Sequence, residues 1–150
     1  MSRIKIRQPI VRTPGFREYR IAGAELYRKY KAMGVRMPFP MSDHWYYHSD
    51  REGWAILVSH LLFKSSLYKT DRFDCEDYAI KAMVTCAELF GLNTFRYTYG
   101  NTPLGRHGFN SFWTGESFLL FEPNAGFQSQ LASPVFEWGE NQYAPINVLI

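Results

Sequence analysis

Residues Phe73 to Ala79 read Phe-Asp-Cys-Glu-Asp-Tyr-Ala and place a single cysteine, Cys75, among three carboxylates. Asp74 can cap a helix by accepting a hydrogen bond from a free backbone N–H, and the two acids after Cys75 favour the positive end of a helix dipole. From Tyr78 to Phe90 apolar residues recur at three- and four-residue steps, and Gly91 follows in the position of a C-cap. The stretch therefore predicts a helix that begins with a thiol in a position to act as a nucleophile.

The composition is that of a globular chain. With 150 residues, of which 46% are hydrophobic and 17% aromatic, the chain is long enough to bury a sizeable core, so one domain is expected. No run approaches the roughly 18 consecutive apolar residues that cross a bilayer, and no apolar signal-peptide core follows the first residues. A soluble, cytoplasmic protein without a membrane span is therefore expected.

The two cysteines cannot form a disulfide with each other. Cys75 and Cys86 are eleven residues apart on the predicted helix, which separates them by roughly 16 Å along its axis, too far for a disulfide. A lone cysteine on an apolar helix face is usually a small core residue, and we assign Cys86 that role.

Charge is unevenly distributed. Up to Arg36 the chain has ten Lys or Arg against two acids, a net charge of +8 that leaves −5 for the rest. The first 15 residues contain Pro9 and a Pro-Gly pair, so they are expected to be extended. A basic arm suits nucleic acid or an anionic surface, but no nucleic-acid motif accompanies it, and we expect a solvated basic face instead.

Outside the cysteine helix, spacing predicts helices at 16–33 and 51–65. His44 and His48 are four residues apart in an aromatic loop; they could hold a metal only if the loop were helical and supplied a third ligand. Alternating residues predict a strand at 94–99 and a hairpin with strands at 107–113 and 117–122.

A thiol nucleophile needs a base, and the base needs an acceptor that orients it. His107 begins the first hairpin strand, and Glu122 and Asn124 stand at the end of the second. If the turn is Thr114-Gly115, His107 faces Glu122; if it is Gly115-Glu116, as a leading glycine favours, His107 faces Asn124. Either acceptor completes a Cys-His-acceptor triad with Cys75.

These residues resemble a known family. The segment Asp74 to Lys81, with Phe90-Gly91-Leu92 after it, is similar to the cysteine motif of the bacterial transglutaminase-like cysteine proteinases. Two further segments, Arg106 to Asn110 and Phe121 to Asn124, are similar to the Gly-x-His and Phe-Asp-Pro segments of that superfamily. The resemblance covers about 71–126. It departs from the family pattern where Glu122 replaces the usual Asp and Arg106 stands in place of a Gly.

The resemblance implies an α+β fold with a papain-like or transglutaminase-like core, in which the nucleophile helix packs on an antiparallel sheet behind N-terminal helices. It implies one transglutaminase-like domain with a basic arm at 1–15, a helical region at 16–66 and a catalytic core at 67–150. The triad would be Cys75, His107 and Glu122, with Asn124 as the alternative third member. No cofactor is required, although the resemblance implies calcium at Asp74 and Glu76, where a divalent cation would also offset carboxylate repulsion of the thiolate.

The implied function is that of a cysteine hydrolase (peptidase) or acyltransferase acting on an amide of a protein or peptide substrate. The backbone N–H of Cys75 would contribute to an oxyanion hole, with Tyr68, Lys69 and Trp45 as candidates for the second donor. The alternative is a catalytically inactive transglutaminase-fold module for binding or assembly.

Overall fold

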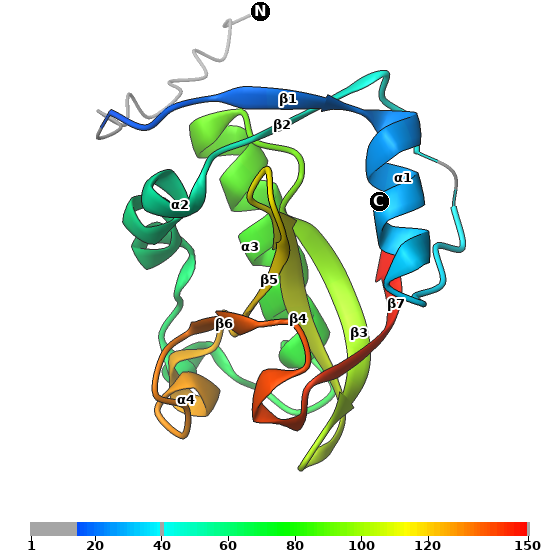
Figure 1. Cartoon of the computed structure of the whole chain (residues 1–150). Coiled ribbons are helices and arrows are strands. Elements are labelled where there is room, and N and C mark those ends of the chain that lie inside the picture. The colour runs from blue at the N-terminus through cyan, green and yellow to red at the C-terminus, as the bar shows by residue number, and fades with distance from the viewer. Residues whose placement is uncertain (1–14, 40, 150) are drawn as a thin grey trace, which may run out of the picture.

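The computed structural model describes residues 15–39 and 41–149 (Figure 1). The basic arm predicted at 1–15 lies outside the described residues except for Gly15. None of the helices in the described part of the chain has the length and apolar character needed to cross a membrane.

Five antiparallel strands form the main sheet in the order β6-β5-β4-β3-β7. They are β3 (Arg96–Thr102), β4 (Gly105–Trp113), β5 (Phe118–Phe121), β6 (Val135–Glu137) and β7 (Ala144–Leu149). The central strand β4 is buried from His107 to its end, so its side chains on both faces belong to the interior. This strand carries the predicted base into the middle of the fold.

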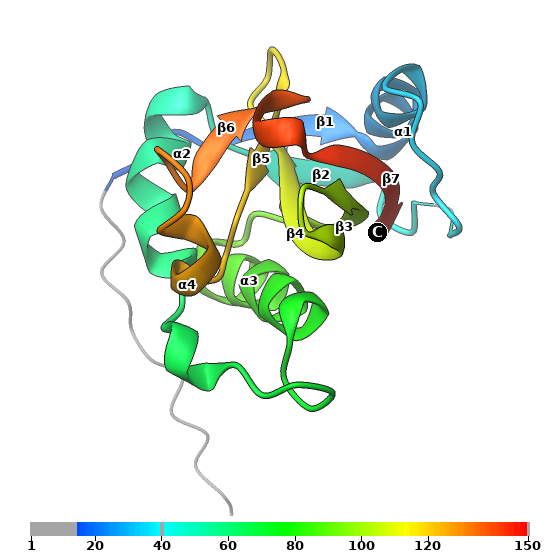
Figure 2. The ribbon, with the colours of Figure 1, turned by 90° about the horizontal axis from the view of Figure 1, so that it is seen from below.

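Helix α3 (Cys75–Phe90) begins and ends where the sequence predicts, with Gly91 in the left-handed conformation at φ 71°. It lies along one face of the sheet against β3 and β4 (Figure 2). The Asn110 side chain joins the two layers because its Nδ2 donates to the Ala79 carbonyl at 2.8 Å and to the Arg96 carbonyl at 3.2 Å.

The largest apolar core lies between α3, the sheet and the helical segment α2 (Arg51–Leu57) with η1 (Val58–Leu61). Cys86 is fully buried in it, as expected for a structural thiol. Trp54 is also buried there, and its indole N–H donates to the Trp113 carbonyl at 2.9 Å. The core residues come from distant segments, namely Trp54, Leu57, Leu61, Ala82, Cys86, Phe90, Phe95, Phe112 and Phe121.

The N-terminal region differs from the predicted helix at 16–33. It begins with strand β1 (Tyr19–Ala22), and only then follows helix α1 (Gly23–Ala32). β1 pairs with β2 (Trp45–His48) in a separate two-stranded sheet, which runs across the top of Figure 1. Because His48 lies in a strand and is buried, the helical arrangement needed for a His44–His48 metal site does not form.

The β4–β5 hairpin has Gly115-Glu116 as its two-residue turn. Trp113 pairs with Phe118 and Asn110 with Phe121, and Gly115 has φ +95°, a conformation that favours glycine. Continued beyond the paired residues, this register sets position 124 opposite His107, as the turn chemistry predicted. It also places Glu122 opposite Phe109, two residues along the strand from His107 and on the same face of the sheet.

Candidate functional site

The site begins at the first residue of α3. Cys75 is partly exposed, and its thiol donates to the Glu76 carboxylate at 3.2 Å. The Asp77 carboxylate accepts a hydrogen bond from the backbone N–H of Asp74 at 3.2 Å, which ties down the first turn. A thiol at the N-terminus of a 16-residue helix lies where the helix dipole stabilises a thiolate.

The predicted base and acceptor are in direct contact. His107 Nε2 lies 2.6 Å from Glu122 Oε2, and the side chains are only 5% and 1% exposed. Burial alone would lower the pKa of His107, but the neighbouring Cys75 thiol and Glu122 carboxylate raise it to about 9. The ring is therefore an imidazolium at neutral pH; its Nε2–H donates to Glu122, and its Nδ1–H is the second donor.

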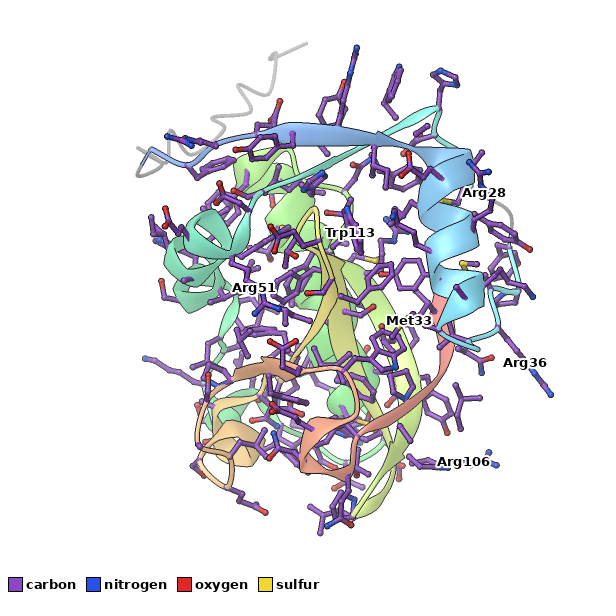
Figure 3. The ribbon with its side chains drawn as sticks, viewed as in Figure 1. Arg28, Met33, Arg36, Arg51, Arg106 and Trp113 are labelled. Carbon is purple, nitrogen blue, oxygen red and sulfur yellow. The ribbon has the colours of Figure 1, made fainter. Side chains whose placement is uncertain are left out.

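The strand separates His107 from its neighbour Arg106. Arg106 is exposed and extends away from the molecule (Figure 3), whereas His107 is buried. Phe127 stacks on the imidazole with its ring centre 4.7 Å away, and Tyr143 meets it edge-on at 6.0 Å. These rings restrict the orientation of the imidazole and exclude water from the Glu122 side.

Glu122 is held by three donors. Its Oε2 accepts from His107 and from the Tyr143 hydroxyl, the latter at 3.0 Å, and its Oε1 accepts from the Asn124 backbone N–H at 3.1 Å. A buried carboxylate satisfied in this way stays in one position. Tyr143 and Phe127 were not among the predicted site residues, because no spacing rule links either residue to His107.

Asn124, the alternative acceptor, has a different role. Its side chain accepts from the Gly126 backbone N–H at 2.9 Å and so caps the short helix α4 (Ala125–Gln128). The structure thus brings Cys75, His107 and Glu122 together and assigns Asn124 to the adjacent turn.

Gly108 sets the distance between the two halves of the site. A Cβ at this position would lie 2.9 Å from the Glu76 Cα and 3.0 Å from the Glu76 backbone nitrogen. Only glycine allows β4 to approach the first turn of α3 this closely, and that approach places His107 beside Cys75.

The predicted calcium ligands lie beside the thiol. Asp74, Cys75 and Glu76 each offer a ligand atom, and these atoms lie within 4.8 Å of one another. A hydrogen bond between the two carboxyl groups raises the pKa of Asp74 and lowers that of Glu76. Within the described residues, the buried Asp74 Oδ1 has no hydrogen-bond partner. The two carboxylates would suit a hard cation and the sulfur would not, so Asp74 and Glu76 would hold it.

The candidates for a second oxyanion donor lie in different places. Lys69 is in the loop before Cys75, where its backbone N–H donates to the Phe73 carbonyl at 2.8 Å. Tyr68, in the same loop, is 43% exposed and thus free to turn toward a ligand. Trp45 begins β2, and the Arg20 guanidinium covers its ring at 4.2 Å.

No protein-family model matches the chain, and no curated protein sequence matches it either. The solved structures that have a similar fold include the following two. The "PSL1a-E64 complex" has a TM-score of 0.60 and 20% identity, and the match covers 87% of this chain and 51% of that chain. Polyporus squamosus lectin bound to the human-type influenza-binding epitope Neu5Aca2-6Galb1-4GlcNAc has a TM-score of 0.61 and 18% identity over 87% of this chain and 49% of the lectin. This chain therefore spans about half the length of those chains and shares their fold over that part.

These comparisons overturn the family suggested by the cysteine motif. The structures that resemble the chain over 87% of its length include a lectin, so the transglutaminase-like assignment and the papain-like or transglutaminase-like fold class are wrong. The implied cysteine hydrolase or acyltransferase function and its protein or peptide substrate are withdrawn with the assignment, as is the inactive transglutaminase-fold module. The physical reason is that the motif encodes a helix start and two strand ends, local features that many folds use.

Proposed function

We propose that this chain binds a ligand carrying an electrophilic carbon and bonds it covalently to the Cys75 sulfur. The observation that carries the proposal is the buried contact of 2.6 Å between His107 and Glu122, next to a thiol at a helix N-terminus. A protonated imidazole and a helix dipole both favour the thiolate, which is the reactive form of cysteine.

The reaction is a nucleophilic attack. The proton of the Cys75 thiol is already held by the His107 imidazolium, so the thiolate attacks the carbon. A C–S bond forms, and a bonding electron pair of that carbon moves to the atom at the other end of the broken bond. The imidazolium then returns the proton to that atom, so addition needs no further reactant. Glu122 keeps the imidazole in the required orientation throughout because it accepts from Nε2.

Iodoacetamide tests the proposal directly. At pH 7 we expect alkylation of Cys75 to be about tenfold or more faster than that of N-acetylcysteine, because the unperturbed thiol is only a few per cent ionised. His107→Gln should return the rate to that of the free thiol, and Cys75→Ser should abolish labelling. Cys86 is an internal control, since burial raises its thiol pKa and shields it from the reagent in the folded protein. Labelling of Cys75 at the rate of the free thiol, unchanged in His107→Gln, would overturn the proposal.

Glycan binding is a second candidate function, and a comparison favours it. The lectin of similar fold is bound to Neu5Aca2-6Galb1-4GlcNAc. In this chain a cavity of about 740 Å³, lined in part by Tyr27, Asp43 and His44, combines an aromatic ring with polar groups and suits a ligand of several sugar rings.

The test is an NMR titration of the isotope-labelled chain with that trisaccharide, with lactose as the control. Shifts confined to the residues around Tyr27 would support this function, and they should persist in Cys75→Ser. Unchanged spectra at millimolar trisaccharide would exclude glycan binding and would leave the proposal for the Cys75 thiol unaffected.

A further inference from the structure

A second cavity adjoins the candidate site through Phe127 and Tyr143. It has a volume of about 270 Å³ and is lined by the β3–β4 turn, the segment after α4 and the short helix η3 (Glu140–Gln142). The β3–β4 turn and α4 lie toward the bottom of Figure 1. The residues that line it are Thr102, Pro103, Leu104, Phe127, Gln130, Leu131, Asn141, Gln142 and Tyr143.

Two aromatic residues form a wall shared by this cavity and the site. Phe127 lines the cavity and also stacks on the His107 ring at 4.7 Å. Tyr143 lines the cavity and also donates from its hydroxyl to Glu122 at 3.0 Å. The cavity and the site therefore share these two side chains.

The lining defines the chemistry of the occupant. Leu104, Leu131 and Pro103 join the two aromatic rings in an apolar interior, and none of the residues that line the cavity carries a charge. Leu104 is 69% exposed, so its side chain is accessible to an apolar group of a ligand. The volume is below the roughly 300–1,000 Å³ that holds a whole drug-sized molecule, so it suits one group of a larger ligand.

The rim carries unusual backbone. Asn141 and Gln142 both line the cavity and both have positive φ, 55° and 60°. Consecutive non-glycine residues in this conformation cost free energy and are found where the surrounding structure needs them, often at ligand sites. Both residues also offer a side-chain amide, which can donate and accept hydrogen bonds.

We propose that this cavity is a subsite for one uncharged apolar group, aliphatic or aromatic and no larger than a benzyl group, of the ligand that reacts at Cys75. This inference rests on the proposed function of Cys75. It adds that the ligand is selected by an apolar side group seated on the Phe127 and Tyr143 wall.

The test compares two reagents on the folded chain, iodoacetamide and N-benzyl-iodoacetamide, each rate being divided by that of the same reagent with N-acetylcysteine. We expect the benzyl reagent to be favoured about tenfold at Cys75, as burial of a group of this size in an apolar pocket allows. Leu104→Asp should remove most of this preference, because it places a carboxylate at the pocket. Leu104 is exposed enough for the variant to fold, which circular dichroism would verify.

Val84→Asp is the matched control, since Val84 is 54% exposed on α3 and does not line the cavity. It should keep the wild-type preference. Fast labelling by iodoacetamide with no preference for the benzyl reagent would overturn the subsite and leave the reactive thiol in place. Slow labelling by both reagents would overturn the proposed function and the subsite together.

Discussion

The imidazole of His107 and the carboxylate of Glu122 are 2.6 Å apart in the interior, with 5% and 1% of their side chains exposed. In the low-dielectric interior the imidazole and the carboxylate attract each other strongly. If either side chain were removed, the other would remain as a buried polar group without a hydrogen-bond partner. Both the stability and the reactivity of the chain should therefore respond to changes at this contact.

The first prediction concerns pH. The pKa of His107 is about 9 in the folded chain, above its ordinary value of about 6.5, so the folded state holds this proton more tightly than the unfolded state. Its contribution is fully present below about pH 6.5 and is lost as the pH rises to about 9, a decrease of roughly 3 kcal/mol in the free energy of unfolding. Urea unfolding followed by tryptophan fluorescence measures this.

His60 provides the control for that experiment, because it is exposed. His60→Gln should show the same decline between pH 6.5 and 9, whereas His107→Gln should flatten it. A wild-type stability that stays constant across this window would show that His107 does not hold its proton as described.

The second prediction contrasts two glutamates that pair with cations. Glu122→Gln leaves a buried imidazole without its carboxylate and should cost roughly 3 kcal/mol at pH 7. Glu137 bonds Arg51 at 2.7 Å, but both side chains are nearly half exposed, so Glu137→Gln should cost less than about 1 kcal/mol. Equal losses in urea unfolding would mean that burial does not distinguish the two pairs.

The third prediction tests the close approach at Gly108. An added Cβ would meet the Glu76 backbone at 2.9 Å, so Gly108→Ala must push the start of α3 away from β4. We expect a loss of roughly 1–3 kcal/mol in stability and slower alkylation of Cys75, because His107 no longer lies beside it. Gly15→Ala is the matched control, since a Cβ there has no neighbour within 4 Å among residues 15–39 and 41–149. If Cys75 is alkylated at the wild-type rate in both variants, the close packing of β4 against the start of α3 does not position the site.

Local chemistry explains what the sequence could predict. The helix from Cys75 to Phe90 has its start signal, its periodicity and its C-cap within one stretch, and the Gly115 turn determines the register of the hairpin. These features depend on neighbouring residues only. They were enough to bring His107 and Glu122 to one face of the sheet.

Long-range contacts explain what it could not. Tyr19 to Ala22 has a helical apolar spacing, yet these residues become strand β1 because Trp45 to His48 offer a pairing edge more than twenty residues away. Tyr143 reaches Glu122 only after a turn with two left-handed residues, which no pattern announces. The family assignment failed for a related reason: a short motif specifies a helix start and leaves the fold around it open.

The last prediction joins the thiol to the calcium hypothesis, which the sequence suggested for Asp74 and Glu76. The Glu76 carboxylate accepts from the Cys75 thiol at 3.2 Å and would repel the thiolate. Glu76→Gln should therefore raise the rate of Cys75 alkylation at pH 7 by about three- to tenfold, the effect of one partly screened charge at this distance. Glu88→Gln, on the same helix but near its far end, should leave the rate unchanged.

Calcium at Asp74 and Glu76 would neutralise the same charge. Millimolar calcium should then raise the wild-type rate by a similar factor and raise the thermal midpoint, with both effects reversed by EDTA. Glu76→Gln should gain little from calcium, because it lacks the charge and one ligand. A wild-type rate and midpoint indifferent to calcium would refute the cation site, whereas a faster Glu76→Gln would still show that this carboxylate restrains the thiol.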